Sequence, residues 1–195
     1  MGNIHFNLNN SAHLGGLAPP PLAAGGFGNA LLPGGMYGMA GTYIIVNSNS
    51  NNRYIGIAND IGTRFNTRLA TITETGFLPA EMARIGVTWG TTTCQNTAPV
   101  FGVAPAPVLA VPAPPAAFNA VIDGVAVNLE RLLIRFVITQ LGAGGTVSNN
   151  AMAVAPYANP TANPITVRLT WGAMGGLYLA GFHQAIWNVG MINAW

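Results

Sequence analysis

The sequence predicts an α+β protein, because segments with the period of a strand and segments with the period of a helix both occur along it. A β-hairpin is indicated at 41–58, where "TYIIV" and "RYIGIA" flank the turn-forming "NSNSNN". A helix is indicated where Asn128 precedes the regularly spaced apolar residues of "LERLLIRF". The length of 195 residues suits one domain with attached arms, or two small domains at most.

Residues 1–40 read as an uncharged Gly/Pro-rich arm, in which Gly and Pro clusters interrupt any long helix or strand. Within it, Ile4, Phe6 and Leu8 alternate with polar neighbours, so we expect a short strand there. A strand at the end of such an arm can add to the sheet edge of another subunit. We therefore expect the arm to be an assembly contact.

A second helix is expected directly after the hairpin, with Asn59 or Asp60 as its N-cap. Its apolar face would consist of Ile61, Phe65, Leu69 and Ile72. The segment 85–91, "IGVTWGT", is expected to be a strand. The Pro/Ala-rich segment 97–118 is expected to be an extended insertion, either a linker or a clasp over apolar surface, and its Val and Leu content favours the clasp.

The helix that follows Asn128 has one apolar stripe, and Gly142 suits its C-terminal end. The stripe consists of Leu129, Leu132, Leu133, Phe136 and Val137. Residues 152–195 contain the alternating strand "NPITVRLTW" and an apolar, nearly uncharged extension. The extension is expected to be either core or interface.

Charged residues make up only 6% of the chain, against roughly a quarter in an ordinary soluble protein. There is no lysine, and the formal net charge is +2. Phosphate backbones are usually held by several Lys or Arg contacts, of which this chain offers few. A surface with so little charge favours association, so the composition predicts that the main partner of the chain is another copy of itself.

Targeting signals and redox chemistry leave the compartment open. No Lys or Arg precedes Arg53, so we expect no standard secretory signal, and Pro, Asn and Gly interrupt every long uncharged stretch, so we expect no transmembrane segment. Cys94 is the single cysteine and is expected to be a partly buried small apolar residue. Extracellular and cytoplasmic assembly therefore both remain possible. The histidines at positions 5, 13 and 183 are expected to be structural.

"GTYIIVN" followed by "RYIGIANDIGTRF" resembles the paired motif of the GIY-YIG endonuclease superfamily. Tyr43 stands at the tyrosine of the first motif, and Tyr54-Ile55-Gly56 is the second motif intact. Arg64 follows at the position of the helix arginine of the family. Thr42 replaces the usual isoleucine, and Arg68 stands where many members have histidine, a departure that does not exclude catalysis.

The resemblance continues beyond the Pro-rich insertion and covers about 41–151. Glu130 opens a helix as the metal-binding glutamate of the family does, and Asn149 and Asn150 resemble its closing asparagine segment. The resemblance implies a small antiparallel sheet flanked by helices, with the Gly/Pro-rich arm and the C-terminal extension added to it. We therefore divide the chain into 1–40, 41–151 and 152–195.

The same resemblance implies phosphodiester hydrolysis by named residues. Tyr43 or Tyr54 would help to deprotonate the attacking water, and Arg64 would stabilise negative charge on the phosphate. Glu130 would hold one divalent cation, for which Mg²⁺ is the expected ion. Asn149 and Asn150 would complete the site. No resident cofactor is expected unless the chain is a nuclease.

Each of these residues also has an ordinary structural role open to it. The tyrosines suit strands, Gly56 suits close packing, and Arg64 can pair with Asp60 on one helix face. Glu130 suits the first turn of any helix, where the helix dipole favours negative charge.

Two functions follow from these readings. The composition favours a non-enzymatic, self-assembling structural protein, a subunit of a filament, tube or sheet that reuses a GIY-YIG-like domain. The alternative is an active Mg²⁺-dependent endonuclease, for which alone nucleic acid is an expected partner.

Overall fold

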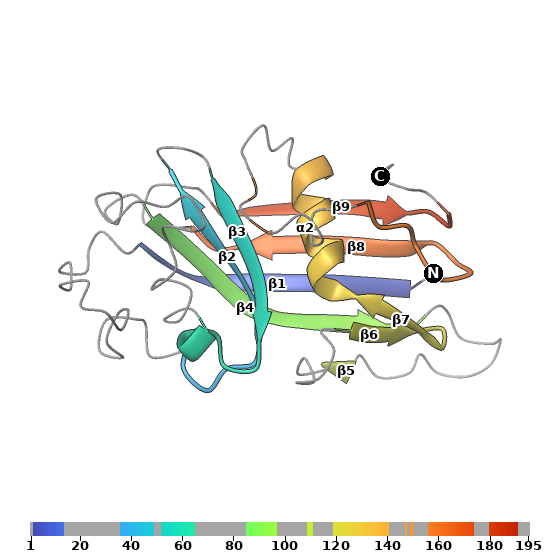
Figure 1. Cartoon of the computed structure of the whole chain (residues 1–195), viewed down its shortest axis with the longest axis horizontal. Coiled ribbons are helices and arrows are strands. Elements are labelled where there is room, and N and C mark those ends of the chain that lie inside the picture. The colour runs from blue at the N-terminus through green and yellow to red at the C-terminus, as the bar shows by residue number, and fades with distance from the viewer. Residues whose placement is uncertain are drawn as a thin grey trace.

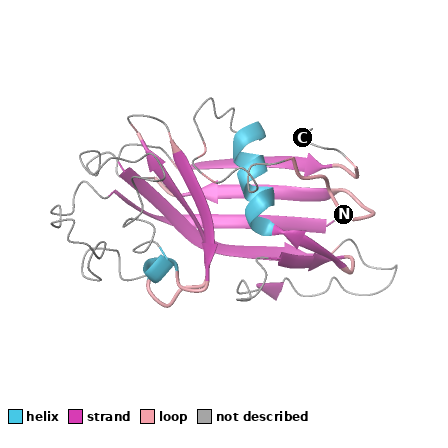
Figure 2. Cartoon of the chain, viewed as in Figure 1, coloured by secondary structure: helices cyan, strands magenta, loops and turns pink. Residues whose placement is uncertain are grey.

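The computed structural model is dominated by one sheet, with a helix lying across one of its faces (Figures 1 and 2). The described residues are 2–13, 36–48, 52–64, 85–96, 109–110, 119–140, 147, 149, 156–173 and 180–190. Within these residues the protein is a sheet-rich α+β structure, which confirms the predicted class. None of the described helices has the length and apolar character needed to cross a membrane.

The central sheet has seven strands in the order β3-β2-β4-β1-β8-β9, with β5 paired to β4 off this path. These strands are β1 (Gly2–His13), β2 (Gly41–Asn47), β3 (Arg53–Ala58), β4 (Ile85–Gln95), β5 (Leu109–Ala110), β8 (Ile165–Trp171) and β9 (Gly181–Trp187). A separate hairpin pairs β6 (Asn119–Ile122) with β7 (Val125–Asn128), which leads directly into the helix α2 (Leu129–Gln140).

The position of β1 corrects two expectations. The sheet is neither small nor purely antiparallel, because β1 lies in its interior, parallel to β8 and antiparallel to β4. The predicted strand at Ile4, Phe6 and Leu8 is present, but it pairs within its own chain rather than with another subunit. These three side chains are 0% exposed, so their burial in the core of the chain holds the strand in place. Residues 14–35 of the predicted arm lie outside the described residues.

The predicted hairpin at 41–58 is confirmed. β2 and β3 are antiparallel neighbours, and Tyr43 lies opposite Gly56. The turn is closed where the Asn47 N–H donates to the Asn52 carbonyl oxygen at 2.9 Å. The predicted strand at 85–91 is also present, and as β4 it continues to Gln95.

The helix predicted after the hairpin begins where expected. The Asp60 carboxylate accepts hydrogen bonds from the Thr63 N–H at 3.0 Å and the Thr63 hydroxyl at 2.9 Å, as an N-cap does. The described helical turn covers 61–64, and Ile61 is 0% exposed. The rest of the predicted stripe, Phe65, Leu69 and Ile72, lies outside the described residues.

The helix predicted after Asn128 is confirmed as α2. The Asn128 side-chain oxygen accepts a hydrogen bond from the Arg131 N–H at 2.9 Å, which satisfies one free N–H of the first turn. All five residues of the predicted stripe are buried, and Ile134 joins them. Gly142 lies outside the described residues.

The hairpin β6–β7 was not predicted, although its turn has a recognisable signature. Asp123 and Gly124 both have positive φ, 52° and 78°, as the two central residues of a tight hairpin turn require. The Asp-Gly pair between "NAVI" and "VAVN" is therefore the signal that sequence reasoning missed. Of the insertion at 97–118, only Leu109–Ala110 is described, and it pairs with β4.

The C-terminal region contributes two strands to the sheet. The strand predicted at "NPITVRLTW" is β8, and β9 pairs with it antiparallel at the edge. Trp187 is 1% exposed and belongs to the core, whereas Phe182 is 58% and Ile186 43% exposed. In the described part of the extension, β9 therefore has one face that packs into the core and one face that is exposed.

The two faces of the sheet carry different clusters of apolar side chains, because successive residues of a strand point to opposite sides. On β2, Ile44 and Val46 pack on the same side as α2, which we call the helix face. Tyr43 and Ile45 point to the other side, which we call the tyrosine face. The apolar cluster on the tyrosine face consists of Met36, Tyr43, Ile45, Tyr54, Ala58, Ile61, Ile85, Val87 and Trp89.

Candidate functional site

Tyr43 is held in the apolar cluster of the tyrosine face. It lies on β2, its side chain is 0% exposed, and its ring covers the backbone of Gly56 on the neighbouring strand. A Cβ atom at Gly56 would overlap this ring, so the glycine creates the space that the tyrosine fills. The tyrosine of the first motif and the glycine of the second are thus packing partners.

Tyr54 is the second tyrosine of the predicted site, and the structure brings it next to the first. The two ring centroids are 6.2 Å apart and the planes are inclined by 30°. Tyr54 is 7% exposed and lies opposite Ile45 on β2. Both tyrosines therefore lie within the core of this face rather than on an open surface.

Arg64 is exposed at the end of the helical turn 61–64. Ile61 anchors this turn in the apolar cluster of the tyrosine face, so Arg64 lies on the same side of the sheet as the two tyrosines. The sequence suggested that Asp60 pairs with Arg64. In the structure the Asp60 carboxylate instead accepts hydrogen bonds from Thr63. The Thr63 N–H is the main cause that lowers the pKa of the Asp60 carboxyl below 3.8.

Glu130 lies in the first turn of α2, on the other side of the sheet. Leu129, Leu132 and Leu133 pack α2 against the helix face together with Ile44 and Ile55. Since Tyr43 and Tyr54 point to the tyrosine face, the sheet stands between them and the helix that carries Glu130. The structure therefore does not bring the predicted metal ligand together with the tyrosines.

Asn149 forms a backbone-like pair with the outer edge of β3. Its side-chain oxygen accepts from the Ile55 N–H at 3.1 Å, and its side-chain nitrogen donates to the Ile55 carbonyl oxygen at 2.7 Å. Val147 forms a parallel bridge with Arg53 on the same edge. Asn149 thus holds β3 in place through both of its polar atoms. Asn150 lies outside the described residues.

The residues that the resemblance assigns to a Mg²⁺ ion do not fit a shared cation and phosphate site. Glu130 is separated by the sheet from the buried tyrosines. Within the described ranges, no group of three or more His, Cys, Asp or Glu side chains converges on a point where a metal ion could bind. An ion at Glu130 would accordingly not contact a phosphate held beside Tyr43.

The other candidate side chains have structural surroundings, with one exception. The His183 ring packs edge-on to Phe136, and its Nε2 atom lies 3.2 Å from the Gln140 side-chain oxygen. Cys94 is 8% exposed, and burial raises the pKa of its thiol to about 12. His5 is the exception, because it lies on the central strand β1 beside Arg168 of β8. His5 was expected to be structural, and the alternation of Ile4 and Phe6 with polar residues is the signal that could have placed it on the opposite face.

Comparison with known families gives one match. Residues 39–76 match the family model of the GIY-YIG catalytic domain. This span contains β2, β3 and the helical turn, with Tyr43, Tyr54, Gly56 and Arg64, and it excludes Glu130. Neither the curated proteins nor the solved structures gave a match.

Proposed function

We propose that this chain, a member of the GIY-YIG superfamily, is a self-assembling structural protein that uses its GIY-YIG-like domain as a scaffold. It would be the subunit of a filament, tube or sheet. The observation that carries this proposal is the edge strand β9, which is uncharged and exposes Phe182 and Ile186 on one face.

The two edges of the sheet differ in a way that favours pairing at β9. The β3 edge is occupied by its own chain, through Asn149 at Ile55 and Val147 at Arg53. On β9, the Asn159 side chain donates a hydrogen bond to the carbonyl oxygen of Trp187, which is the last residue of the strand. Residues 181–186 have no strand on their outer side within the described part of the chain.

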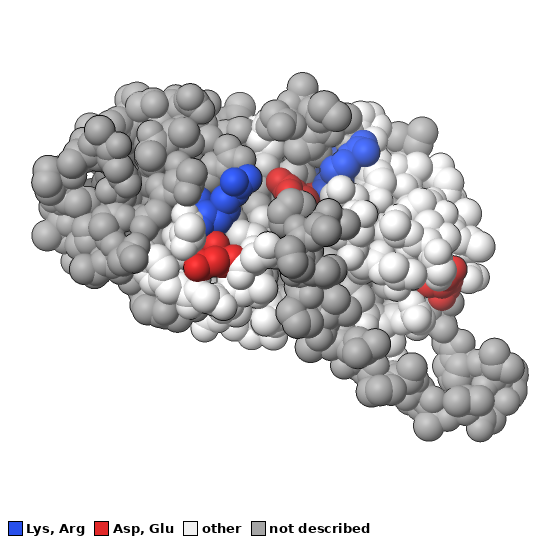
Figure 3. Space-filling model, turned by 60° about the horizontal axis from the view of Figure 1, so that its bottom comes forward, with Lys and Arg blue, Asp and Glu red and all other residues white. Residues whose placement is uncertain are grey.

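The side chains of β9 lack the usual protection of an edge strand. Soluble proteins commonly block such edges with Lys, Pro, bulges or inward-pointing charge. "GFHQAIW" contains no charged residue and no proline. Figure 3 shows a face of the molecule on which the charged side chains of the described residues are few and basic and acidic ones in part lie next to each other. A second copy that adds its strand to β9 would pair backbone groups and cover Phe182 and Ile186.

The geometry of this pairing determines what can be built from it. Two β9 strands that pair around a two-fold axis form a dimer and leave no further β9 edge. Growth beyond a dimer then needs a second contact surface. For this second contact we propose the part of the 1–40 arm outside the described residues, with 41–151 as the scaffold.

Electron microscopy and sedimentation velocity of the purified full chain test the proposal. Ile186→Lys, and separately Phe182→Lys, should reduce the assembly size, because each introduces a charge at the paired edge. Val121→Lys is the matched control, since Val121 is 64% exposed but lies on the β6–β7 hairpin. A wild-type chain that stays monomeric at all concentrations would refute self-assembly. Equal effects of the Ile186 and Val121 variants would exclude β9 as the interface.

The second candidate function is a Mg²⁺-dependent endonuclease, which the family-model match at 39–76 favours. The exposed Arg64 on the tyrosine face would be its phosphate contact, beside Tyr43 and Tyr54, whereas Glu130 lies across the sheet from them. A DNA and RNA cleavage assay with added Mg²⁺ tests it, and Arg64→Ala is the control. Cleavage that the wild type and Arg64→Ala share equally would identify a contaminating nuclease and reject this function.

A further inference from the structure

On the sheet face opposite α2, the register of four strands places polar side chains side by side. His5 on β1 lies opposite Thr93 on β4 and beside Arg168 on β8, and Arg168 in turn lies opposite Gln184 on β9. The next row toward the start of β1 contains Asn3 opposite Gln95. In this part of β1 the apolar side chains are Ile4, Phe6 and Leu8, which point to the helix face, so the opposite face is free to be polar.

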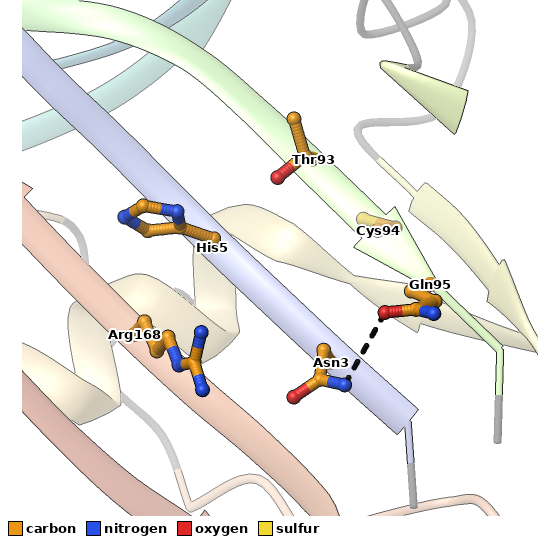
Figure 4. Close-up of a pocket in the computed structure, with 6 residues that line it drawn as sticks. All are labelled: Asn3, His5, Thr93, Cys94, Gln95 and Arg168. Atoms are coloured by element: carbon orange, nitrogen blue, oxygen red, sulfur yellow. Dashed lines mark hydrogen bonds between the residues drawn. The ribbon is translucent and has the colours of Figure 1, made fainter. Parts of the chain in front are cut away.

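These rows surround a hollow of about 290 Å³. It is lined by Asn3, His5, Thr93, Cys94, Gln95 and Arg168, as Figure 4 shows. None of these lining residues is a carboxylate, and Arg168 is exposed, so the formal charge of the lining is positive. A positive hollow that contains several uncharged hydrogen-bonding groups is complementary to an anion rather than to a cation or an apolar ligand.

Arg168 is oriented by its neighbour on β9. Its Nε atom donates to the Gln184 side-chain oxygen at 2.7 Å, which fixes the plane of the guanidinium group. Figure 4 shows this group on the side of the hollow that faces Asn3. Asn3 donates to the Gln95 side-chain oxygen at 3.5 Å, so the two amides are arranged as a pair.

His5 contributes a group that can change its charge. Its Nε2 atom lies 2.9 Å from the Thr170 hydroxyl, which donates to the Asn7 side-chain oxygen at 3.3 Å. This chain of donors assigns a proton to Nε2, so Nδ1 is the nitrogen that takes up the second proton. Burial, and then the charge of Arg168, lower the pKa of His5 below 6.5, so the imidazole is neutral at pH 7.

We propose that this hollow binds a small tetrahedral oxyanion, a phosphate or sulfate group, with Arg168 as its principal ligand and His5 as a proton-linked second one. Arg168 would bind the anion through its terminal N–H groups. The other donors would be the amide groups of Asn3 and Gln95 and the hydroxyl of Thr93. The lining residues of the hollow lie on β1, β4 and β8, and only Gln184, which orients Arg168, lies on the proposed assembly strand β9.

The proposal predicts the sign of a pH dependence. Besides His5, the side chains that face the hollow are the uncharged Asn3, Thr93 and Gln95 and the basic Arg168, whereas the Cys94 side chain belongs to the core on the helix face. A bound anion offsets the repulsion from Arg168 and raises the pKa of His5. Binding therefore takes up a proton and strengthens as the pH falls from about 8 toward 5, by at most about tenfold per pH unit.

Equilibrium dialysis of the full chain against radiolabelled sulfate at constant ionic strength tests the site. Sulfate keeps its charge over this pH range, and dialysis measures binding whether or not the chain assembles. We expect saturable binding of one sulfate per chain that Arg168→Gln weakens at least about tenfold, as the loss of a charged hydrogen bond predicts. His5→Gln should keep binding at the upper pH and lose its pH dependence.

Arg53→Gln is the control for the loss of one positive charge, because Arg53 lies on β3, which β2 and β4 separate from β1. Competition with inorganic phosphate and with a nucleoside monophosphate then separates two sources of the same group. Similar displacement by both identifies the free oxyanion, and much stronger displacement by the nucleotide identifies a phosphate ester. Absence of saturable binding, or equal binding by wild type and Arg168→Gln, would overturn the proposal.

Discussion

The phenol ring of Tyr43 lies over Gly56, its cross-strand partner in the β2–β3 hairpin. A Cβ atom at position 56 would be 2.8 Å from Cε1 of the ring and nearer still to Cζ and the hydroxyl oxygen. The two motif residues are therefore coupled through space, and the glycine is explained by packing without any reference to catalysis.

Gly56→Ala should destabilise the protein by about 1–3 kcal/mol, as overpacking of a buried site does. The measurement is the free energy of unfolding in urea. The same substitution in a Tyr43→Leu background should cost less, because the shorter side chain leaves the space free. Additive costs of the two substitutions would show that the ring and the glycine are not coupled.

Asn149→Ala should free the outer edge of β3, because both polar atoms of the amide bind Ile55. Two lost hydrogen bonds correspond to roughly 1–3 kcal/mol. Hydrogen exchange measures this locally. The Ile55 amide should exchange faster in the variant, whereas the Gly56 amide, which points toward β2, serves as the internal control. Unchanged protection at Ile55 would contradict the assigned role.

Cys94 should be unreactive toward thiol reagents in the folded protein at pH 8 and reactive in urea, since burial raises its pKa to about 12 from 9.0. The folded state keeps the thiol protonated, whereas the unfolded chain ionises it above about pH 9. The stability should therefore fall as the pH rises above that value. In Cys94→Ala, the stability should no longer show this loss at alkaline pH. The same dependence of stability on pH in the variant and the wild type would refute this role of Cys94.

Asp60 should make the helical turn sensitive to acid. Its lowered pKa, caused first by the Thr63 N–H, means that the folded state favours the carboxylate. The stabilisation is present above the unfolded value of 3.8 and is lost as the pH falls through the lower folded pKa. Asp60→Asn keeps a capping oxygen but does not titrate, so its acid unfolding profile should lack this component. Identical acid unfolding profiles of the wild type and Asp60→Asn would contradict this role of Asp60.

Local chemistry accounts for the elements that were predicted correctly. The β2–β3 hairpin, the Asp60 cap and the Asn128 cap of α2 each depend on residues close together in the chain. The Asp-Gly turn of β6–β7 has the same character and was readable in principle. In contrast, the pairing of β1 with β8 joins residues more than 150 positions apart, which no local pattern specifies.

The candidate site was predicted as a list of residues, and the structure decides their arrangement. "TYIIV" contains no polar and apolar alternation that would assign Tyr43 to one face of the sheet. Its direction depends on which strands flank β2 and on the side to which α2 returns. The sequence thus determines the hairpin, the caps and the charge-poor composition, because these are local or additive properties. Only the tertiary structure separates Glu130 from the tyrosines and brings His5 beside Arg168, because both results depend on how distant strands pair and which face each side chain takes.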